Sequence, residues 1–390
     1  MKILVAMDSF KGSMTSLEAG KAAKQGILRA DPEARIMLYP LADGGEGTVE
    51  AFLTGETAEA VETEVTGPLG EKVLCQYALI RKKGEKEPMT AVIEIAGAAG
   101  LTLIPKRRRD PMNTTTYGVG EVIRDALQRG CRRFIIGLGG SATNDGGAGM
   151  LQALGVKMLD REGKEIPHGA RGLAALDKIE KDGLLPQLSE CAFVTACDVK
   201  NTLCGENGCS RIFAPQKGAS KEEIFRMDQW LSKYASMIKE SFPDADPCTK
   251  GAGAAGGLGF AFHACLNGKM VSGAELLMQE TGLLEKIRQA DLVLTGEGCL
   301  DGQTVMGKAP VRVALEAKKY RKPVFAFAGR IGEGAVECLD QGITSCYCIT
   351  PEGMPPAESM RKETALKNME ETVYRVLAAT KVSGIDKYQL

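Results

Sequence analysis

The chain has 390 residues, of which 44% are hydrophobic and 25% charged, a composition typical of a folded globular protein and not of a disordered one. This length favours two domains. The 49 basic and 50 acidic residues nearly cancel, which argues against a nucleic-acid-binding protein, and no run of about 18 apolar residues predicts a membrane span.

The N-terminal segment begins with an apolar run at residues 3–7 that ends at Asp8. This run is shorter than the roughly 7–15 apolar residues of a secretory signal, so we predict a buried strand and expect a cytoplasmic protein. A helix is predicted at 16–30 and a second strand at 35–41. The 12 cysteines are then expected to be reduced thiols that pack as small hydrophobic side chains. No CxxC spacing and only two histidines accompany them, which argues against a zinc site.

The middle of the chain has a different pattern. Residues 61–65 and 73–80 predict paired strands around the turn at 67–70. Further strands are predicted at 91–96, 134–138 and 193–196, and helices at 118–129, 148–154, 221–242 and 257–266.

The C-terminal part returns to alternating strands and helices. Strands are predicted at 291–295, 323–328 and 345–349, and helices at 307–318 and 332–341. Alternation of this kind, at both ends of the chain, predicts an α/β fold with a doubly wound parallel sheet. We therefore expect one domain made of residues 1–60 and 276–390, with a second, mixed α/β domain of residues 61–275 inserted into it.

Ligands of open α/β sheets bind at the carboxyl ends of the strands, so the loops that follow the strands are the candidates for chemistry. After the first strand, Lys11 and the hydroxyl groups of Ser9 and Ser13 could meet a phosphate or carboxylate, and Asp8 a metal ion or a sugar-like hydroxyl. A helix cap with a solvated lysine is the alternative. After the second strand, glycines surround Asp43 and Glu46, which favours metal or hydroxyl binding over a simple tight turn.

The strand at 134–138 leads into a glycine loop. Gly139 and Gly140 permit a close approach of the backbone, and Ser141 and Asn144 precede a predicted helix whose free N–H groups would favour an anion. This is the pattern of a phosphate-binding loop, although no Gly-Lys-Ser/Thr follows as in a Walker A motif. A purely structural turn between strand and helix is the alternative.

Three later loops carry further candidates. Asp198 follows the strand at 193–196 and could orient a substrate hydroxyl, or merely cap a helix. Glu297 and Asp301 offer the oxygen ligands that Mg²⁺ prefers. Lys308 could offset phosphate charge or be solvated, and Arg330 is a weaker candidate of the same kind.

These loops are rich in glycine, carboxylates and lysine and poor in histidine, which suits phosphoryl transfer, where catalysis is mainly positioning and charge neutralisation. They do not suit an acyl-transfer triad, because no Gly-x-Ser-x-Gly elbow is present. Taken in order, the blocks that stand out are 8–13, 43–48, 139–147, 198–201, 216–219, 251–259 and 295–304.

This succession of blocks resembles that of the bacterial-type glycerate kinase family, specifically its glycerate 2-kinase branch. The resemblance implies a flavodoxin-like domain with a second α/β domain inserted, a cleft between them, and ATP-dependent phosphorylation of D-glycerate to 2-phosphoglycerate with Mg²⁺ or Mn²⁺. The partners would be small molecules, and the protein a monomer or homo-oligomer. Cys299, Cys204 and Cys209 depart from the residues expected at their positions but leave the carboxylates intact.

Roles within such an enzyme follow from the chemistry of the residues. We expect the ATP phosphates at Gly139, Gly140, Ser141 and Asn144 with Lys11 and Lys308, and the metal ion at Glu297 and Asp301. Asp198 or Asp43 would accept the proton of the substrate hydroxyl. Asp8, Ser9 and Arg330 would hold the substrate, Arg330 through its carboxylate. Two other functions remain open: a kinase for a related hydroxy acid or polyol, and a regulator that binds nucleotide without turnover.

Overall fold

The computed structural model describes residues 1–42, 44–45, 47–54, 58–81, 89–305 and 307–382. The chain divides into two units, one made of Met1–Asp43 with Ala274–Leu390 and the other of Gly44–Gly273. The first junction precedes α2 (Thr48–Leu53), because this helix packs against β4 (Lys72–Ile80) and β5 (Met89–Glu94) of the second unit. The sequence had placed that junction after residue 60.

The first unit contains a five-stranded parallel sheet in the order β13 (Ser345–Cys348), β12 (Val324–Ile331), β11 (Leu292–Leu300), β1 (Lys2–Met7) and β2 (Arg35–Leu38). In order of sequence this is 2-1-3-4-5, the flavodoxin-like arrangement, and it confirms the expected fold class. The strand order reverses between β1 and β11. Ligands of such sheets bind outside the carboxyl ends of the strands at this reversal.

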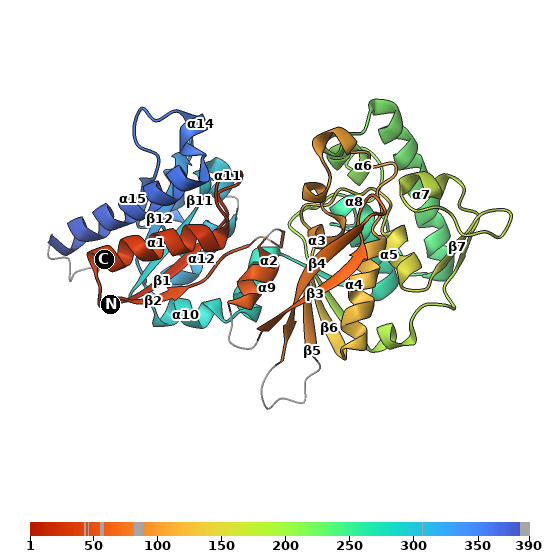
Figure 1. Cartoon of the computed structure of the whole chain (residues 1–390), viewed down its shortest axis with the longest axis horizontal. Coiled ribbons are helices and arrows are strands. Elements are labelled where there is room, and N and C mark those ends of the chain that lie inside the picture. Colours follow the sequence, from red (N-terminus) through yellow and green to blue (C-terminus); the bar gives the residue numbers. More distant parts are fainter. Residues whose placement is uncertain (43, 46, 55–57, 82–88, 306, 383–390) are drawn as a thin grey trace. The chain divides into compact units, whose positions relative to one another are not determined.

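Both faces of this sheet are covered, because successive side chains of a strand point to opposite sides. From β1, Ile3 and Val5 pack with α1 (Ser16–Ala30) and α15 (Lys362–Val382), which run side by side in Figure 1. Leu4 and Ala6 pack on the other face with α10 (Leu283–Gln289) and α12 (Ala309–Lys319). The sheet therefore lies between two helical layers.

Helix α1 has the bounds that the sequence predicts. Its start is fixed locally: Thr15 Oγ1 accepts the N–H of Glu18 at 3.2 Å, and the Glu18 carboxylate accepts the N–H of Thr15 at 3.0 Å. Other elements differ from their predictions. The strand predicted at 291–295 extends to Leu300, because it pairs with β12 as far as Leu300 and Ile331. The helix predicted at 332–341 is only α13 (Glu337–Asp340), preceded by a turn in which Gly334 has φ +79°.

The second unit contains a six-stranded sheet in the order β10 (Lys269–Val271), β9 (Ala192–Ala196), β6 (Cys131–Gly137), β5, β4 and β3 (Ala58–Thr66). The pairs from β10 to β5 are parallel and the last two are antiparallel. The predicted pairing around the turn at 67–70 is thus confirmed. A separate antiparallel pair is formed by β7 (Lys157–Leu159) and β8 (Lys178–Glu180).

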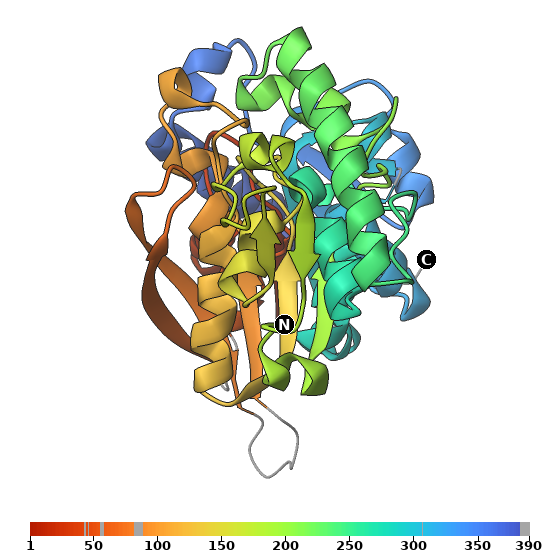
Figure 2. The ribbon, with the colours of Figure 1, turned by 90° about the vertical axis from the view of Figure 1, so that its right-hand side faces the viewer.

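The helices of the second unit include α4 (Tyr117–Gln128) and α7 (Lys221–Ser241), which lie on the near side of the sheet in Figure 2. On α8 (Ala254–Leu266) the first residues form a left-handed turn, since Ala255, Gly256 and Gly257 have φ of 52°, 68° and 97°. The second unit also contains the short helices α3 (Ala96–Ala99), α5 (Ala148–Ala153) and α6 (Cys209–Phe213), with 3-10 turns at Leu101–Leu103, Lys106–Arg108, Ala170–Ala174, Pro186–Glu190 and Pro215–Lys217. The short helices α11 (Gly302–Val305) and α14 (Pro356–Ser359) belong to the first unit, and α9 (Gly273–Glu280) begins at the junction. No helix in the described part of the chain is long and apolar enough to cross a membrane.

Candidate active site

The reversal of strand order in the first unit brings the ends of β1 and β11 side by side. Met7 pairs with Gly296, and the N–H of Asp8 donates to the carbonyl of Gly296 at 2.8 Å. Asp8 is therefore the neighbour of the segment that carries Glu297. The N–H of Ser9 donates to Asp8 Oδ1 at 2.6 Å, which orients that carboxylate. Two acidic residues thus lie near the carboxyl ends of β1 and β11, where the fold predicts a ligand.

Glu297 lies inside β11, not in a loop, and it is 7% exposed. Its carboxylate has two partners: Thr304 Oγ1 donates to Oε1 at 2.6 Å, and Lys308 Nζ lies 3.1 Å from Oε2. The N–H of Asp301 in turn donates to Thr304 Oγ1 at 3.1 Å. The buried carboxylate is consequently held by a hydroxyl group and a cation rather than left unpaired, as its burial requires.

Lys308 also approaches Asp301, with Nζ 3.7 Å from Oδ1. Desolvation opposes the charge of Lys308, but Glu297 and then Asp301 raise its pKa above the usual value. Desolvation likewise acts to raise the pKa of Asp301, and the N–H groups of Gln303 and Thr304 with the charge of Lys308 reverse this and lower it. Both shifts favour the charged forms of Lys308 and Asp301, which lie next to each other.

The other candidates of the first unit lie near this cluster along the chain or across the sheet. Lys11 is exposed in the loop after β1, and Gly298 of β11 is close to that loop, since a Cβ added there would be 3.6 Å from the N atom of Lys11. Arg330 is exposed and pairs with Cys299 between β12 and β11. The carboxyl ends of β1, β11 and β12 therefore carry four of the candidates, namely Asp8, Lys11, Glu297 and Arg330.

In the second unit the glycine loop follows β6. A Cβ on Gly139 would lie 2.4 Å from Gly45 Cα, and Gly140 has φ +71°, so the close approach and the backbone turn both require glycine. The N–H of Leu101 donates to the carbonyl of Gly140 at 2.8 Å. These contacts fix the path of the loop and leave Gly140 exposed to solvent.

Two residues further along the loop, Asn144 and Asp145, are buried. Asn144 is fully buried, and its Nδ2 donates to Ser210 Oγ at 2.8 Å. Asp145 is fully buried too, and its carboxylate accepts from the N–H and Oγ1 of Thr116, both at 2.9 Å, and from the N–H groups of Gly147 and Gly149. In this structure Asn144 and Asp145 support the loop from inside, whereas Gly139 and Gly140 form its outer part.

Lys217 is the functional candidate that the sequence did not single out. It is 2% exposed, and its Nζ donates to Ser141 Oγ at 2.8 Å and to the carbonyl of Thr143 at 2.7 Å. The only sequence signal was its place in the Gln-Lys-Gly block at 216–218.

Asp198 follows β9 and is exposed, and its Oδ1 accepts a hydrogen bond from Ser272 Oγ at 2.8 Å. Ser272 comes directly after the neighbouring strand β10. The loop that precedes α2 reaches the same edge, because a Cβ on Gly44 would lie 2.5 Å from Ala196 Cβ, at the end of β9. The predicted Asp43 in that loop is outside the described residues.

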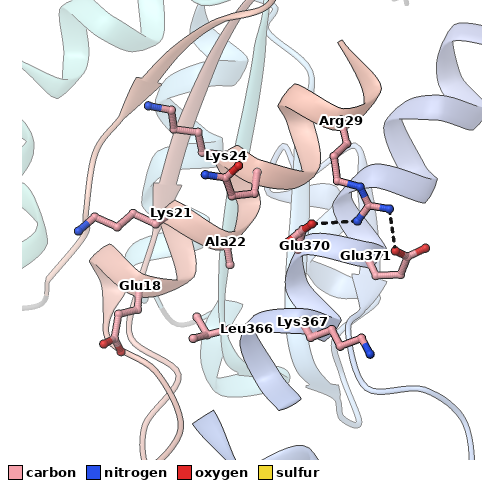
Figure 3. A pocket seen from close by; sticks show the side chains of 10 residues that line it. Glu18, Lys21, Ala22, Lys24, Arg29, Leu366, Lys367, Glu370 and Glu371 are labelled. Atoms are coloured by element: carbon pink, nitrogen blue, oxygen red, sulfur yellow. Dashed lines mark hydrogen bonds and ion pairs between the residues drawn. The ribbon is translucent and has the colours of Figure 1, made fainter. Parts of the chain in front are cut away.

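A groove of about 700 Å³ also lies along α1 and α15 (Figure 3). Three of its charged side chains pair with one another, since Arg29 contacts Glu370 at 2.9 Å and Glu371 at 3.2 Å. The lining contains none of the residues predicted for the site.

Comparison with known proteins identifies the family of this chain. The sequence profile of the glycerate kinase family matches residues 3–381. The chain belongs to the glycerate kinase family.

Glycerate kinases of known sequence resemble this chain over nearly their full length. A glycerate 2-kinase of Escherichia coli (strain K12) is 45% identical over 90% of each chain, and a glycerate kinase of Halalkalibacterium halodurans is 43% identical over 93% of this chain and 94% of its own. A crystal structure named as that of a glycerate kinase 2 from Salmonella typhimurium LT2 superposes with a TM-score of 0.84 at 41% identity, covering 99% of this chain and 100% of the other.

Proposed function

We propose that this chain transfers the γ-phosphoryl group of ATP to D-glycerate and produces 2-phosphoglycerate and ADP. The observation that carries this proposal is the family match over residues 3–381, together with the 45% identity to a glycerate 2-kinase. The charged groups support it, because carboxylates and lysines gather at strand ends and no histidine lies among them. Such a set suits phosphoryl transfer.

The ATP phosphates lie against the glycine loop in this proposal. The backbone of Gly139 and Gly140 comes close enough to a ligand because neither residue has a side chain, and Ser141 adds a hydroxyl group. Lys11 and Lys308 supply positive charge. Asn144 stabilises the loop from inside through its hydrogen bond to Ser210.

Mg²⁺ (or Mn²⁺) would be held by Asp301 and Glu297. No group of three or more His, Cys, Asp or Glu side chains within the described ranges is arranged as a metal site. Magnesium in kinases is usually bound by one or two carboxylates together with the substrate phosphates, so the proposal needs no more than these two side chains. Asp301 is the better ligand, since Glu297 is 7% exposed and already paired with Thr304 and Lys308. When bound, the ion neutralises charge on the phosphate oxygens.

Substrate binding and proton transfer use the remaining candidates. Asp198, oriented by Ser272, accepts the proton of the attacking hydroxyl, a role that Asp43 would share or take over. Arg330 binds the glycerate carboxylate with its planar guanidinium. Asp8 and Ser9 hold the second hydroxyl group.

The test is turnover by the purified protein with D-glycerate, ATP and Mg²⁺ or Mn²⁺. ADP formation is followed by a coupled assay, and ³¹P NMR distinguishes 2-phosphoglycerate from 3-phosphoglycerate. Asp301→Asn and Asp198→Asn are expected to lower kcat at least about 100-fold, the range of a lost acid–base or electrostatic group. Asp340→Asn, an exposed aspartate of α13, is the matched control and should retain activity.

Two outcomes would contradict the proposal. If another hydroxy acid or a polyol is preferred by more than about tenfold in kcat/KM, roughly 1.4 kcal/mol of discrimination, the chain is a kinase for that substrate. If ATP binds but no acceptor is phosphorylated, the chain is a nucleotide-binding regulator.

A further inference from the structure

A lysine side chain is buried against the glycine loop, and the proposed function assigns it no part. Lys217 is 2% exposed at the end of a 3-10 turn (Pro215–Lys217). No carboxylate of the described residues lies within 4.0 Å of its Nζ, so no direct ion pair explains its burial. Burying a lysine costs free energy that only hydrogen bonds or an opposite charge can offset.

Those hydrogen bonds go to the glycine loop. Nζ donates to Ser141 Oγ at 2.8 Å and to the carbonyl of Thr143 at 2.7 Å. A serine hydroxyl has one hydrogen to donate and oxygen lone pairs to accept with. Because Lys217 donates to the oxygen, the hydrogen of Ser141 remains available as a donor, and the neighbouring charge polarises it. Ser141 is 8% exposed, directly after the exposed Gly140.

We infer that Lys217 is a positioning residue for phosphoryl transfer, which orients the Ser141 hydroxyl so that it donates to a phosphate oxygen of the bound nucleotide. The inference rests on the proposed binding of ATP phosphates at this loop. Lys217 does not touch the substrate itself. It orients the Ser141 hydroxyl group toward the phosphate site before the nucleotide binds. Preorganised donors of this kind give large electrostatic effects in catalysis.

The pKa of Lys217 depends on its burial and on the titratable groups around it, and it lies in a pH range where activity can be assayed. Burial lowers the pKa of Lys217 to about 8, which Cys209 of α6 and Asp145 of the loop oppose. Burial raises the pKa of the Cys209 thiol to about 12, so this neighbour is neutral at pH 8. Arg109 faces the turn through its backbone carbonyl, since a Cβ on Gly218 would lie 2.5 Å from it. The charge of Lys217 is therefore present below about pH 8 and lost as the pH rises through that value.

The experiment compares Lys217→Met, Ser141→Ala and the double variant, with Lys221→Met as the matched control on an exposed lysine at the start of α7. Each single variant should lower kcat/KM for ATP by about 10²-fold, the effect of removing one preorganised donor. KM for glycerate should change by less than about threefold. The double variant should be no worse than Lys217→Met alone, since residues that act as one unit are not additive.

The pH profile separates positioning from a structural role. Wild-type kcat/KM for ATP should fall as the pH rises through about 8. Lys217→Arg, whose charge persists at every accessible pH, should recover part of the activity and lose this alkaline decline. Ser141→Ala should lose the decline as well, and this variant keeps the test valid if Lys217→Met does not fold. Multiplying effects in the double variant, or an unchanged alkaline decline in Ser141→Ala, would overturn the inference.

Nucleotide binding distinguishes the failure of this inference from the failure of the proposed function. Calorimetric titration with Mg²⁺ and AMP-PNP, without glycerate, should show weaker binding to Lys217→Met than to wild type and Lys221→Met. If wild type binds the analogue but phosphorylates no glycerate, the proposed function fails while the effect of Lys217 on binding still stands. If wild type phosphorylates glycerate and Lys217→Met equals it in both binding and turnover, only the inference fails.

Discussion

Thr304→Val tests whether the hydroxyl group of Thr304 holds the carboxylate cluster of the first unit. Valine preserves the shape of the side chain but removes the donor to Glu297 Oε1 at 2.6 Å and the acceptor for the N–H of Asp301 at 3.1 Å. Thr304 is 0% exposed, so water does not replace either partner easily. A hydrogen bond to a charged group contributes roughly 1.5–3 kcal/mol and one between neutral groups roughly 0.5–1.5 kcal/mol.

The expected loss of unfolding free energy is therefore about 2–4 kcal/mol, below the top of the summed range of roughly 2–4.5 kcal/mol because Lys308 stays on the other oxygen of Glu297. With an m value of about 2 kcal/mol per molar urea, the midpoint should fall by roughly 1–2 M. Thr304→Ser keeps the hydroxyl group and should stay close to wild type.

Urea unfolding is followed by far-UV circular dichroism and by tryptophan fluorescence together. The chain has one tryptophan, Trp230, in the second unit, so fluorescence serves as an internal control for that unit. Thr304→Val should shift the dichroism transition of the first unit and leave the fluorescence transition in place, which also checks whether the two units unfold separately. A midpoint within about 0.3 M of wild type, less than about 0.6 kcal/mol, would refute the reasoning.

Three further predictions follow from close contacts and charge. Gly26→Ala would place Cβ 2.4 Å from a backbone oxygen of α15 and should destabilise the first unit by about 1–3 kcal/mol in the same urea assay, whereas Gly302→Ala, with no atom nearer than 3.9 Å, should be tolerated. Gly139→Ala, at 2.4 Å from Gly45 Cα, should displace the glycine loop and lower kcat/KM for ATP by about 10–100-fold with little change in KM for glycerate. The pKa of Asp301 is lowered in the folded protein despite desolvation, so wild type should lose stability relative to Asp301→Asn as the pH falls below about 4, and a constant difference down to pH 2.5 would contradict this.

Local patterns of the sequence were enough for the class of fold and for many of its elements, although short strands such as β7, β8 and β10 were not predicted. The helix at 16–30 could be predicted because its start depends on Thr15 and Glu18, three residues apart, and on its own apolar spacing. The paired strands around residues 67–70 could be predicted because a turn and two alternating runs are adjacent in the chain. The catalytic candidates were found for a similar reason, since a parallel sheet places its ligand at loops that directly follow strands.

Contacts between distant residues were decided only by the tertiary structure. Glu297 lies within a strand because β11 continues to pair with β12, which no local pattern of 296–300 indicates. Asn144 faces the interior because Ser210, 66 residues away, receives its hydrogen bond. Lys217 reaches Ser141 across 76 residues, and in the sequence it is an ordinary lysine beside a glycine. The sequence by itself determined the class of fold and the loops that follow its main strands, since these depend on neighbours in the chain. The partners of each buried charge depend on packing between segments that only the folded chain brings together.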